Sequence, residues 1–512
     1  MYKSDVKLNR ETYRDKVLGC WAGKNIGGTL GAPIEGRREI FHYDFYINPM
    51  DGEPAPNDDL DLQLVWLKAM EDHGPMQVNE RILGEYWMRH ISGPWNEYGV
   101  ARNNMANGIL PPLSGSTRND VWKNSNGAWI RSEIWACVFA GDPDWAAWFA
   151  WCDACVDHAD DGVWAEIFTA SLEAAAFVES DLRKLIEYAF ARIPSDSRVA
   201  RSVKIAIDCH DSGKTWEEAR NAVVADSADL GWFQAPANVA FAIIGLLYGD
   251  GDFGKTVCTA INCGDDTDCT GATAGAVLGI IKGYKAIPEK WMAPIGHAIK
   301  SIAVRPWLLR APATIEELSA RAEAMKECAC AELPSLPYLV DGPTELPADM
   351  AKRLSSGEKF ANYNSLRACN RLYFDLPWCK FSMEYLDGAV VEQGQPVRLR
   401  LRTDVGYDEC ASLHLSWKLP EGWTMSPAPS QALMLRMNDF CVCDVTLTPG
   451  PMAGPFAYIP VEATLTSRMA PVLLTVPFAL KGASAVGRMG DDSSQWNSLE
   501  TWERGGCFGK YW

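Results

Sequence analysis

Two short stretches of the sequence concentrate carboxylates where a helix is expected to begin. Residues 57–61 read Asn-Asp-Asp-Leu-Asp and precede an apolar run at 62–69, while residues 263–268 read Cys-Gly-Asp-Asp-Thr-Asp. Asn57 is a natural N-cap, and the helix dipole favours acidic side chains in a first turn. Each stretch taken alone therefore has an ordinary explanation as an acidic, solvated helix start.

The second stretch leads into a segment of small residues, 271–279, which reads Gly-Ala-Thr-Ala-Gly-Ala-Val-Leu-Gly. Because glycine weakens a helix, this composition predicts a buried helix over 271–284 that its neighbours approach closely. Carboxylates buried at its start would repel one another and lose hydration, at a cost of roughly several kcal/mol each. A hard divalent cation removes the conflict, and oxygen donors suit Mg²⁺ best, with Mn²⁺ as the other candidate. We therefore predict that the two acidic starts converge on two metal ions about 4 Å apart, a spacing used to activate water.

The elements around these stretches are predicted to be helical from about residue 11 to about residue 327. Apolar residues recur there at three- and four-residue steps, as in Leu60, Leu64 and Leu67, which is typical of helices that bury one face. The predicted fold class is mainly α, with an all-helical catalytic domain over 1–330.

The pattern changes in the last third of the chain. Prolines punctuate a predicted connector over 331–377, and alternating β-branched runs such as 397–403 follow it. Six or seven short strands are expected over 378–481, in a smaller, Ig-like β-sandwich. The tail over 482–512 is polar but carries aromatic residues that we expect to pack back onto a domain: Trp496, Trp502, Tyr511 and Trp512.

Composition narrows the classes of function. The chain has 512 residues and a net charge of −18, and an acidic surface repels phosphate backbones, so we expect no nucleic acid partner. The first ten residues are polar and the sequence has no long apolar run, so neither a secretion signal nor a membrane span is expected. The sixteen cysteines are then expected to be free thiols of a cytoplasmic protein.

Three motifs together resemble the ADP-ribosylglycohydrolase family. Residues 19–36 are similar to its glycine-rich first helix and the turn that ends in Glu35, residues 57–59 to its Thr-Asp-Asp motif, and residues 264–269 to its Gly-Gly-Asp-Thr-Asp-Thr motif. The three motifs occur in the family's order and span about residues 11 to 300.

The resemblance implies an all-helical domain that holds two magnesium ions in a central cleft and cleaves a ribosyl glycosidic bond. Glu35 would act as the acid/base or water-orienting carboxylate, with Asp59 and Asp266 beside it in the catalytic centre. An oxocarbenium-like transition state gains from such carboxylates. By position in the motifs, the implied metal ligands are Asn57, Asp58, Asp59, Asp266 and Asp268.

Four further residues are candidates for binding the substrate, and two of them, His158 and Lys24, have a structural alternative. His158 resembles the family's central histidine, or is a capping or packing residue. Asn103 and Asn104 resemble a loop near the substrate groove of some relatives. Lys24 would contact a phosphate, or form a salt bridge with one of the aspartates.

Several departures from the family pattern indicate a divergent branch. Asn57 and Cys269 both stand where the family has threonine, and a thiol is a weak ligand for magnesium. Three functions remain open: a magnesium-dependent hydrolase of an ADP-ribosyl or related ribosyl or glycosyl linkage, on a small molecule or a modified protein; a metal-dependent hydrolase of a nucleoside or carbohydrate conjugate; and a non-catalytic protein such as the eye-lens crystallins that resemble this family. Retention of Glu35 with the four aspartates argues against the third, and Cys269 is its best support.

Overall fold

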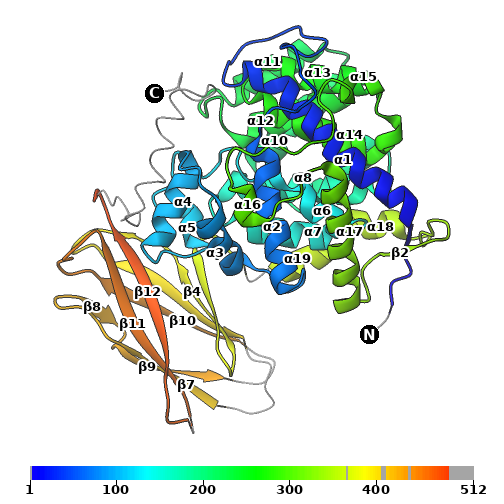
Figure 1. Ribbon diagram of the computed structural model, residues 1–512. Helices are drawn as coiled ribbons and strands as arrows, with labels where there is room; N and C mark the ends of the chain where they lie inside the picture. The colour runs from blue at the N-terminus through cyan, green and yellow to red at the C-terminus, as the bar shows by residue number, and fades with distance from the viewer. Residues whose placement is uncertain (1–2, 365–366, 405–410, 436–439, 467, 484–512) are drawn as a thin grey trace.

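The computed structural model describes residues 3–364, 367–404, 411–435, 440–466 and 468–483. A large helical part precedes a smaller β part, which confirms the predicted fold class (Figure 1). The aromatic residues expected in the tail lie outside the described residues. Among the described helices, none is both long and apolar enough to cross a bilayer.

The helical part contains most of the larger hydrophobic core. Its α-helices are α1 (Arg10–Gly31), α2 (Asp58–His73), α3 (Glu80–His90), α4 (Asn96–Ala106), α5 (Leu113–Ser116), α6 (Glu133–Val138), α7 (Pro143–Ala154), α8 (Asp160–Ala176), α9 (Leu182–Phe190), α10 (Arg198–Asp211), α11 (Trp216–Asp226), α12 (Ala235–Tyr248), α13 (Phe253–Asn262), α14 (Thr267–Lys282), α15 (Glu289–Met292), α16 (Pro306–Leu309) and α17 (Ile315–Glu332). Three short 3₁₀-helices join them: η1 (Ala32–Ile34), η2 (Trp129–Arg131) and η3 (Tyr284–Ala286).

The predicted small-residue helix is α14, and its residues from Thr267 to Ile280 are all buried. It runs against α1 (Figure 1), and the glycines of the two helices meet backbone to backbone. A Cβ on Gly23 would lie 2.0 Å from the carbonyl oxygen of Gly275, and one on Gly27 equally 2.0 Å from that of Gly271. We call this contact the glycine seam; its members are Gly19, Gly23, Gly27, Gly31, Gly271, Gly275 and Gly279.

The glycine seam brings the end of α1 to the beginning of α14. The hydroxyl of Thr267 donates a 2.8 Å hydrogen bond to the carbonyl of Gly31. One turn further on, the amide of Gly36, which has a positive φ of 80°, donates to the carbonyl of Asp265 at 2.8 Å. The turn that carries Glu35 is thereby held beside the loop that carries Asp266.

The stretch expected as a connector contains secondary structure of its own. Strand β2 (Tyr338–Val340) pairs in parallel with β1 (Lys7–Asn9), which precedes α1. Helices α18 (Met350–Ser356) and α19 (Glu358–Asn364) follow, and the first sandwich strand, β3 (Arg371–Asp375), also falls within this stretch.

The β part consists of two five-stranded sheets that share a second hydrophobic core. One sheet has the order β3-β4-β6-β10-β8 and the other β5-β12-β11-β7-β9, so there are more strands than the six or seven expected. Apart from β3 they are β4 (Lys380–Tyr385), β5 (Val390–Val391), β6 (Val397–Asp404), β7 (Ala411–Trp417), β8 (Thr424–Ser426), β9 (Ser430–Leu435), β10 (Phe440–Thr448), β11 (Phe456–Leu465) and β12 (Val472–Leu480).

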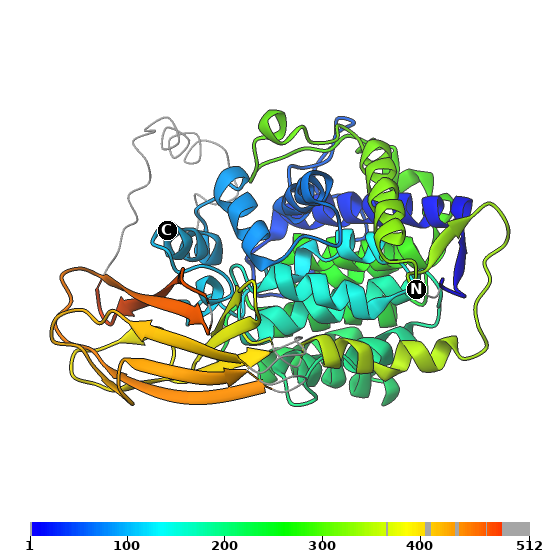
Figure 2. The same cartoon turned by 90° about the horizontal axis from the view of Figure 1, so that it is seen from below.

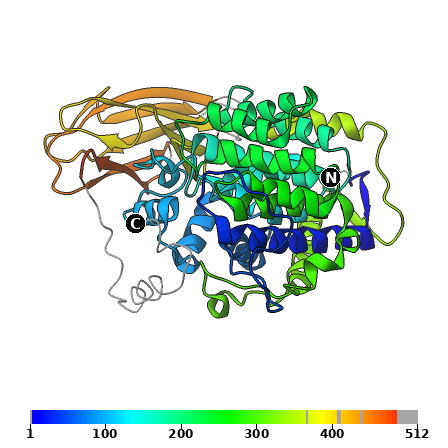
Figure 3. The ribbon, with the colours of Figure 1, turned by 90° about the horizontal axis from the view of Figure 1, so that it is seen from above.

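The sandwich lies at one end of the helical domain, and β1 lies at the opposite end (Figures 2 and 3). Ile109 and Leu113, from the α4–α5 region, are buried in the core of the sandwich. The hydroxyl of Tyr458 on β11 donates a 2.7 Å hydrogen bond to the carbonyl of Asn107. The β part therefore packs directly on the segment that follows α4.

Candidate functional site

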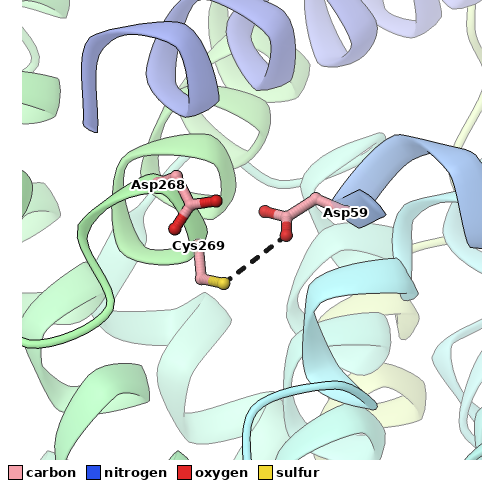
Figure 4. Close-up of side chains that lie close together, drawn as sticks. All are labelled: Asp59, Asp268 and Cys269. Carbon is pink, nitrogen blue, oxygen red and sulfur yellow. Dashed lines mark hydrogen bonds between the residues drawn. The ribbon is translucent and has the colours of Figure 1, made fainter. Parts of the chain in front are cut away.

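The two acidic helix starts converge at the end of the glycine seam. Potential ligand atoms of Asp59, Asp268 and Cys269 lie within 4.8 Å of one another, and so do those of Glu35, Asp266 and Asp268. We call the first set of three residues, which includes Cys269, the thiol group, and the second set, which has carboxylates only, the oxygen group. Asp268 belongs to both sets. Figure 4 shows Asp59 at the start of α2 facing Asp268 and Cys269 at the start of α14.

The carboxylates of this site are buried and under-satisfied. Asp59, Asp266 and Asp268 are 0%, 1% and 8% exposed, and each has one buried oxygen that accepts no hydrogen bond in the described structure. Asp266 occupies the N-cap position of α14, yet its side chain does not cap that helix. Buried acceptors of this kind need a partner, and a divalent cation fits the donor set.

The electrostatics of the site reflect this crowding. Burial raises the pKa of Asp59 and of Asp266 well above the usual range, and the neighbouring Asp268 raises both further. Burial and Asp268 likewise raise the pKa of Asp58 to about 6. Without a cation, the folded protein therefore favours protonated carboxyl groups here.

Asn57 and Asp58 lie at the margin of the cluster. The side-chain oxygen of Asn57 accepts a 2.7 Å hydrogen bond from the amide of Asp59, so Asn57 is the N-cap of α2, as expected from its type. Asp58 is half-buried and accepts a hydrogen bond from the hydroxyl of Tyr98 on α4 at 3.1 Å. Asp58 belongs to neither group of close ligand atoms.

Two neighbouring acidic residues contact other parts of the chain, although both oxygens of Asp265 and one of Asp61 also accept no hydrogen bond in the described structure. The carboxylate of Asp265 lies 3.4 Å from Nε of Arg38, and the backbone of Asp265 has a positive φ of 62°. Asp61 accepts hydrogen bonds from the amides of Ile302 and Ala303 at 2.6 and 2.7 Å, which anchors the loop before α16.

Lys24 is buried beneath the thiol group. Its ammonium donates to Oε1 of Glu133 and to the carbonyl of Ile130, both at 2.7 Å, and it lies 3.9 Å from Oδ2 of Asp59. Burial alone would lower the pKa of Lys24, but Glu133 and Asp59 together raise it above its usual value, so the ammonium stays charged. With 1% of its surface exposed, Lys24 is placed for the ion-pair alternative rather than for contact with a substrate.

The other substrate candidates lie elsewhere. His158 is fully buried, with Nδ1 2.8 Å from Asp157 and Nε2 3.1 Å from the hydroxyl of Ser125, an environment that matches the packing alternative. Asn104 is buried, and its side-chain amide donates hydrogen bonds to the carbonyls of Ser114 and Thr117. Asn103 is half-buried and accepts a hydrogen bond from Asn107 through its carbonyl.

Sequence reasoning did not identify the residues that orient the carboxylates. Asn126 donates its amide to Oδ2 of Asp266 at 2.7 Å, and Asn238 accepts a hydrogen bond from the amide of Asp266 at 3.1 Å. Gln63 bridges the carbonyl of Asp59 and Oε2 of Glu133, at 3.0 and 2.8 Å. Of these residues only Gln63 had a local signal, because it lies one turn after Asp59 on the same helix.

The helical domain and its acidic helix starts define a known class of protein. The chain belongs to the ADP-ribosylglycohydrolase family, whose sequence model matches residues 9–326. That region contains both acidic starts, Glu35 and the glycine seam, and membership indicates a hydrolase of glycosidic bonds. Residues 391–468 match a second family, the NPCBM-associated, NEW3 domain of alpha-galactosidase, and these residues fall within the β part.

No curated protein sequence matches the chain. One solved structure, an alkylpurine DNA glycosylase, AlkC, from Pseudomonas fluorescens bound to DNA containing an abasic site analog, is 10% identical and covers 68% of this chain and 97% of its own. Its TM-score of 0.14 carries no argument about fold or function.

Proposed function

We propose that this protein is a divalent-metal-dependent hydrolase that cleaves an ADP-ribosyl or related ribosyl or glycosyl linkage. The observation that carries the proposal is that two groups of closely spaced ligand atoms, all from buried residues except the half-buried Glu35, have Asp268 in common. The oxygen group, Glu35, Asp266 and Asp268, would hold Mg²⁺ or Mn²⁺, and the thiol group would hold a second ion. Asn57 and Asp58, which precede Asp59 at the start of α2, are further candidate ligands. When bound, such ions polarise ribose hydroxyls and lower the pKa of a water molecule.

The chain's own residues supply the remaining parts of the reaction. Glu35 is half-buried at the end of η1, and we assign it the transfer of a proton from the attacking water to the leaving group. Asn126 keeps Asp266 in one orientation, while Lys24 and Gln63 hold the position of Asp59 from beneath. These are positioning residues, and we assign contact with the substrate to none of them.

A carbohydrate conjugate is the second candidate substrate. The match of the β part to a domain named for alpha-galactosidase supports it, since a domain attached to a glycosidase is a candidate for contact with sugar. A purely non-catalytic role has less support, because buried carboxylates without hydrogen-bond partners are unfavourable in a protein selected only for stability.

The proposal is tested by metal-dependent stability together with product release. Adding Mg²⁺ or Mn²⁺ should raise Tm by mass action, and ADP-ribose should be released from ADP-ribosylated arginine or serine. Asp266→Asn should lose both effects. Asp265→Asn is the matched control, because the adjacent carboxylate faces Arg38 and its loss should leave the metal response intact. If no divalent ion changes Tm, the proposal fails.

A further inference from the structure

The two groups that share Asp268 differ in their donor atoms. The oxygen group offers carboxylates alone, whereas the thiol group includes Sγ of Cys269. Hard cations such as Mg²⁺ prefer carboxylate oxygen, while sulfur favours softer first-row transition ions. The two positions are therefore chemically unequal before any ion binds.

The thiol of Cys269, at the start of α14, is directed towards Asp59. Its Sγ lies 3.4 Å from Oδ1 of Asp59 and donates a hydrogen bond to it (Figure 4). The other oxygen of Asp59 and one oxygen of Asp268 accept no hydrogen bond in the described structure, although both side chains are more than nine-tenths buried. The thiol thus lies in one cluster with two carboxylates, each of which has an oxygen that accepts no hydrogen bond.

A fixed positive charge adjoins the thiol group. The ammonium of Lys24 lies 3.9 Å from Oδ2 of Asp59. An ion in the thiol group must overcome the repulsion of this charge. The strong bond of a transition ion to sulfur offsets such repulsion, and the weak bond of Mg²⁺ to sulfur does not.

We propose that Asp59, Asp268 and Cys269 form a separate binding site for a divalent transition ion of the Zn²⁺, Co²⁺ or Fe²⁺ type, with the Cys269 thiolate as ligand. The S–H bond breaks, its proton leaves to solvent, and a sulfur–metal bond forms with no change of oxidation state. The oxygen group keeps Mg²⁺ or Mn²⁺, so the centre holds two different ions. This inference rests on the metal centre of the proposed function but not on which bond the protein cleaves.

Cobalt is a spectroscopic probe of the thiolate ligand. The full-length protein, stripped with a chelator and supplied with excess Mg²⁺, is titrated with Co²⁺ and followed by near-ultraviolet and visible absorption. We expect a thiolate-to-cobalt charge-transfer band that saturates at one equivalent. Cys269→Thr should lack the band and bind Co²⁺ at least roughly 10-fold more weakly, the lower end of the losses seen when even an outer-shell partner is removed.

Two control variants exclude other thiols. Cys263→Ser removes a buried thiol, between α13 and α14, that donates to the carbonyl of Thr259, and Cys328→Ser removes an exposed one. Both should keep the band. A band that persists in Cys269→Thr, or that fails to form in the presence of the excess Mg²⁺, overturns the proposal.

A measurement on the unsubstituted protein protects the test against a misfolded variant. X-ray absorption of the Zn²⁺-loaded protein should reveal one sulfur neighbour at about 2.3 Å, and a shell of oxygen and nitrogen alone contradicts the inference. The outcomes for the two proposals separate. A band without hydrolysis overturns only the proposed function, and hydrolysis with Mg²⁺ but without a band overturns only the thiolate site.

Discussion

The side-chain amide of Asn126 donates a 2.7 Å hydrogen bond to Oδ2 of Asp266, and its carbonyl oxygen accepts one from the indole of Trp129 at 2.9 Å. Hydrogen bonds thereby orient Asn126 on both sides. The other oxygen of Asp266 accepts no hydrogen bond in the described structure and remains available to a metal ion. Asn126→Ala should lower the affinity for Mg²⁺ by roughly 10- to 100-fold. Calorimetric titration with Mg²⁺ measures the loss, and equal affinity in the variant would show that Asp266 needs no such support.

Glu35→Gln should separate chemistry from folding. The amide keeps an oxygen near the oxygen group but cannot accept a proton, so kcat should fall by roughly 10²- to 10⁴-fold. The Mg²⁺-induced rise in Tm should be reduced but present, because Asp266 and Asp268 remain. A variant that retains full kcat would remove Glu35 from the reaction.

Lys24→Met tests whether the buried lysine is structural. The change leaves Glu133 and Asp59 buried without their cation, which should destabilise the protein by about 3–5 kcal/mol. Urea denaturation measures the change. Lys68→Met is the matched control on α2, since Lys68 forms a partly exposed pair with Asp72 and its loss should cost about 1 kcal/mol or less. A stable Lys24→Met protein with a raised KM would instead support contact with the substrate.

Gly27→Ala tests the glycine seam. An added Cβ would lie 2.0 Å from the carbonyl oxygen of Gly271, so the helices must separate, at a cost of about 1–3 kcal/mol or more. Gly342→Ala adds a methyl group where no heavy atom lies within 4 Å, and it should stay within about 0.5 kcal/mol of the parent. Thermal denaturation compares the two, and equal Tm values would contradict the close contact.

Glu97 should make stability depend on pH. Burial, with a contribution from Asp157, raises its pKa to about 8, whereas a glutamate in the unfolded chain titrates near about 4.3. Between about pH 4 and about pH 8 the folded state therefore holds a proton that the unfolded state has lost. The stabilisation that Glu97 contributes is complete below about pH 4 and is lost as pH rises through about 8. Glu97→Gln lacks this dependence. Its stability relative to the parent protein should rise between about pH 5 and about pH 8 in urea titrations, and a falling difference would have the wrong sign.

Local sequence patterns predicted the parts of the fold that local forces determine. The small residues of α14 and the N-cap at Asn57 required only composition and the chemistry of helix ends. The acidic starts were recognisable as a pair because buried carboxylates without partners are unfavourable. Their convergence followed from the same argument.

Long-range contacts were not visible in the sequence. Asn126 lies 140 residues from Asp266 in the chain, and its surroundings indicate only a turn. Glu133, which accepts a hydrogen bond from Lys24, lies 109 residues away in the chain. The sequence alone therefore could not show whether Lys24 is buried in an ion pair or exposed for contact with a phosphate. In the β part, β3 lies within the stretch that the sequence predicts as a connector. Its pairing with β4 could not be predicted, because an alternation pattern does not specify which strand lies beside it.

The glycine seam also limits how α1 and α14 can dock. Because its glycines recur every four residues on both helices, sliding one helix by a single residue would drive side chains into the facing backbone. Only one alignment permits full contact, and that alignment sets how far Glu35 stands from Asp268. The spacing of these carboxylates is thus dictated by residues that have no side chains.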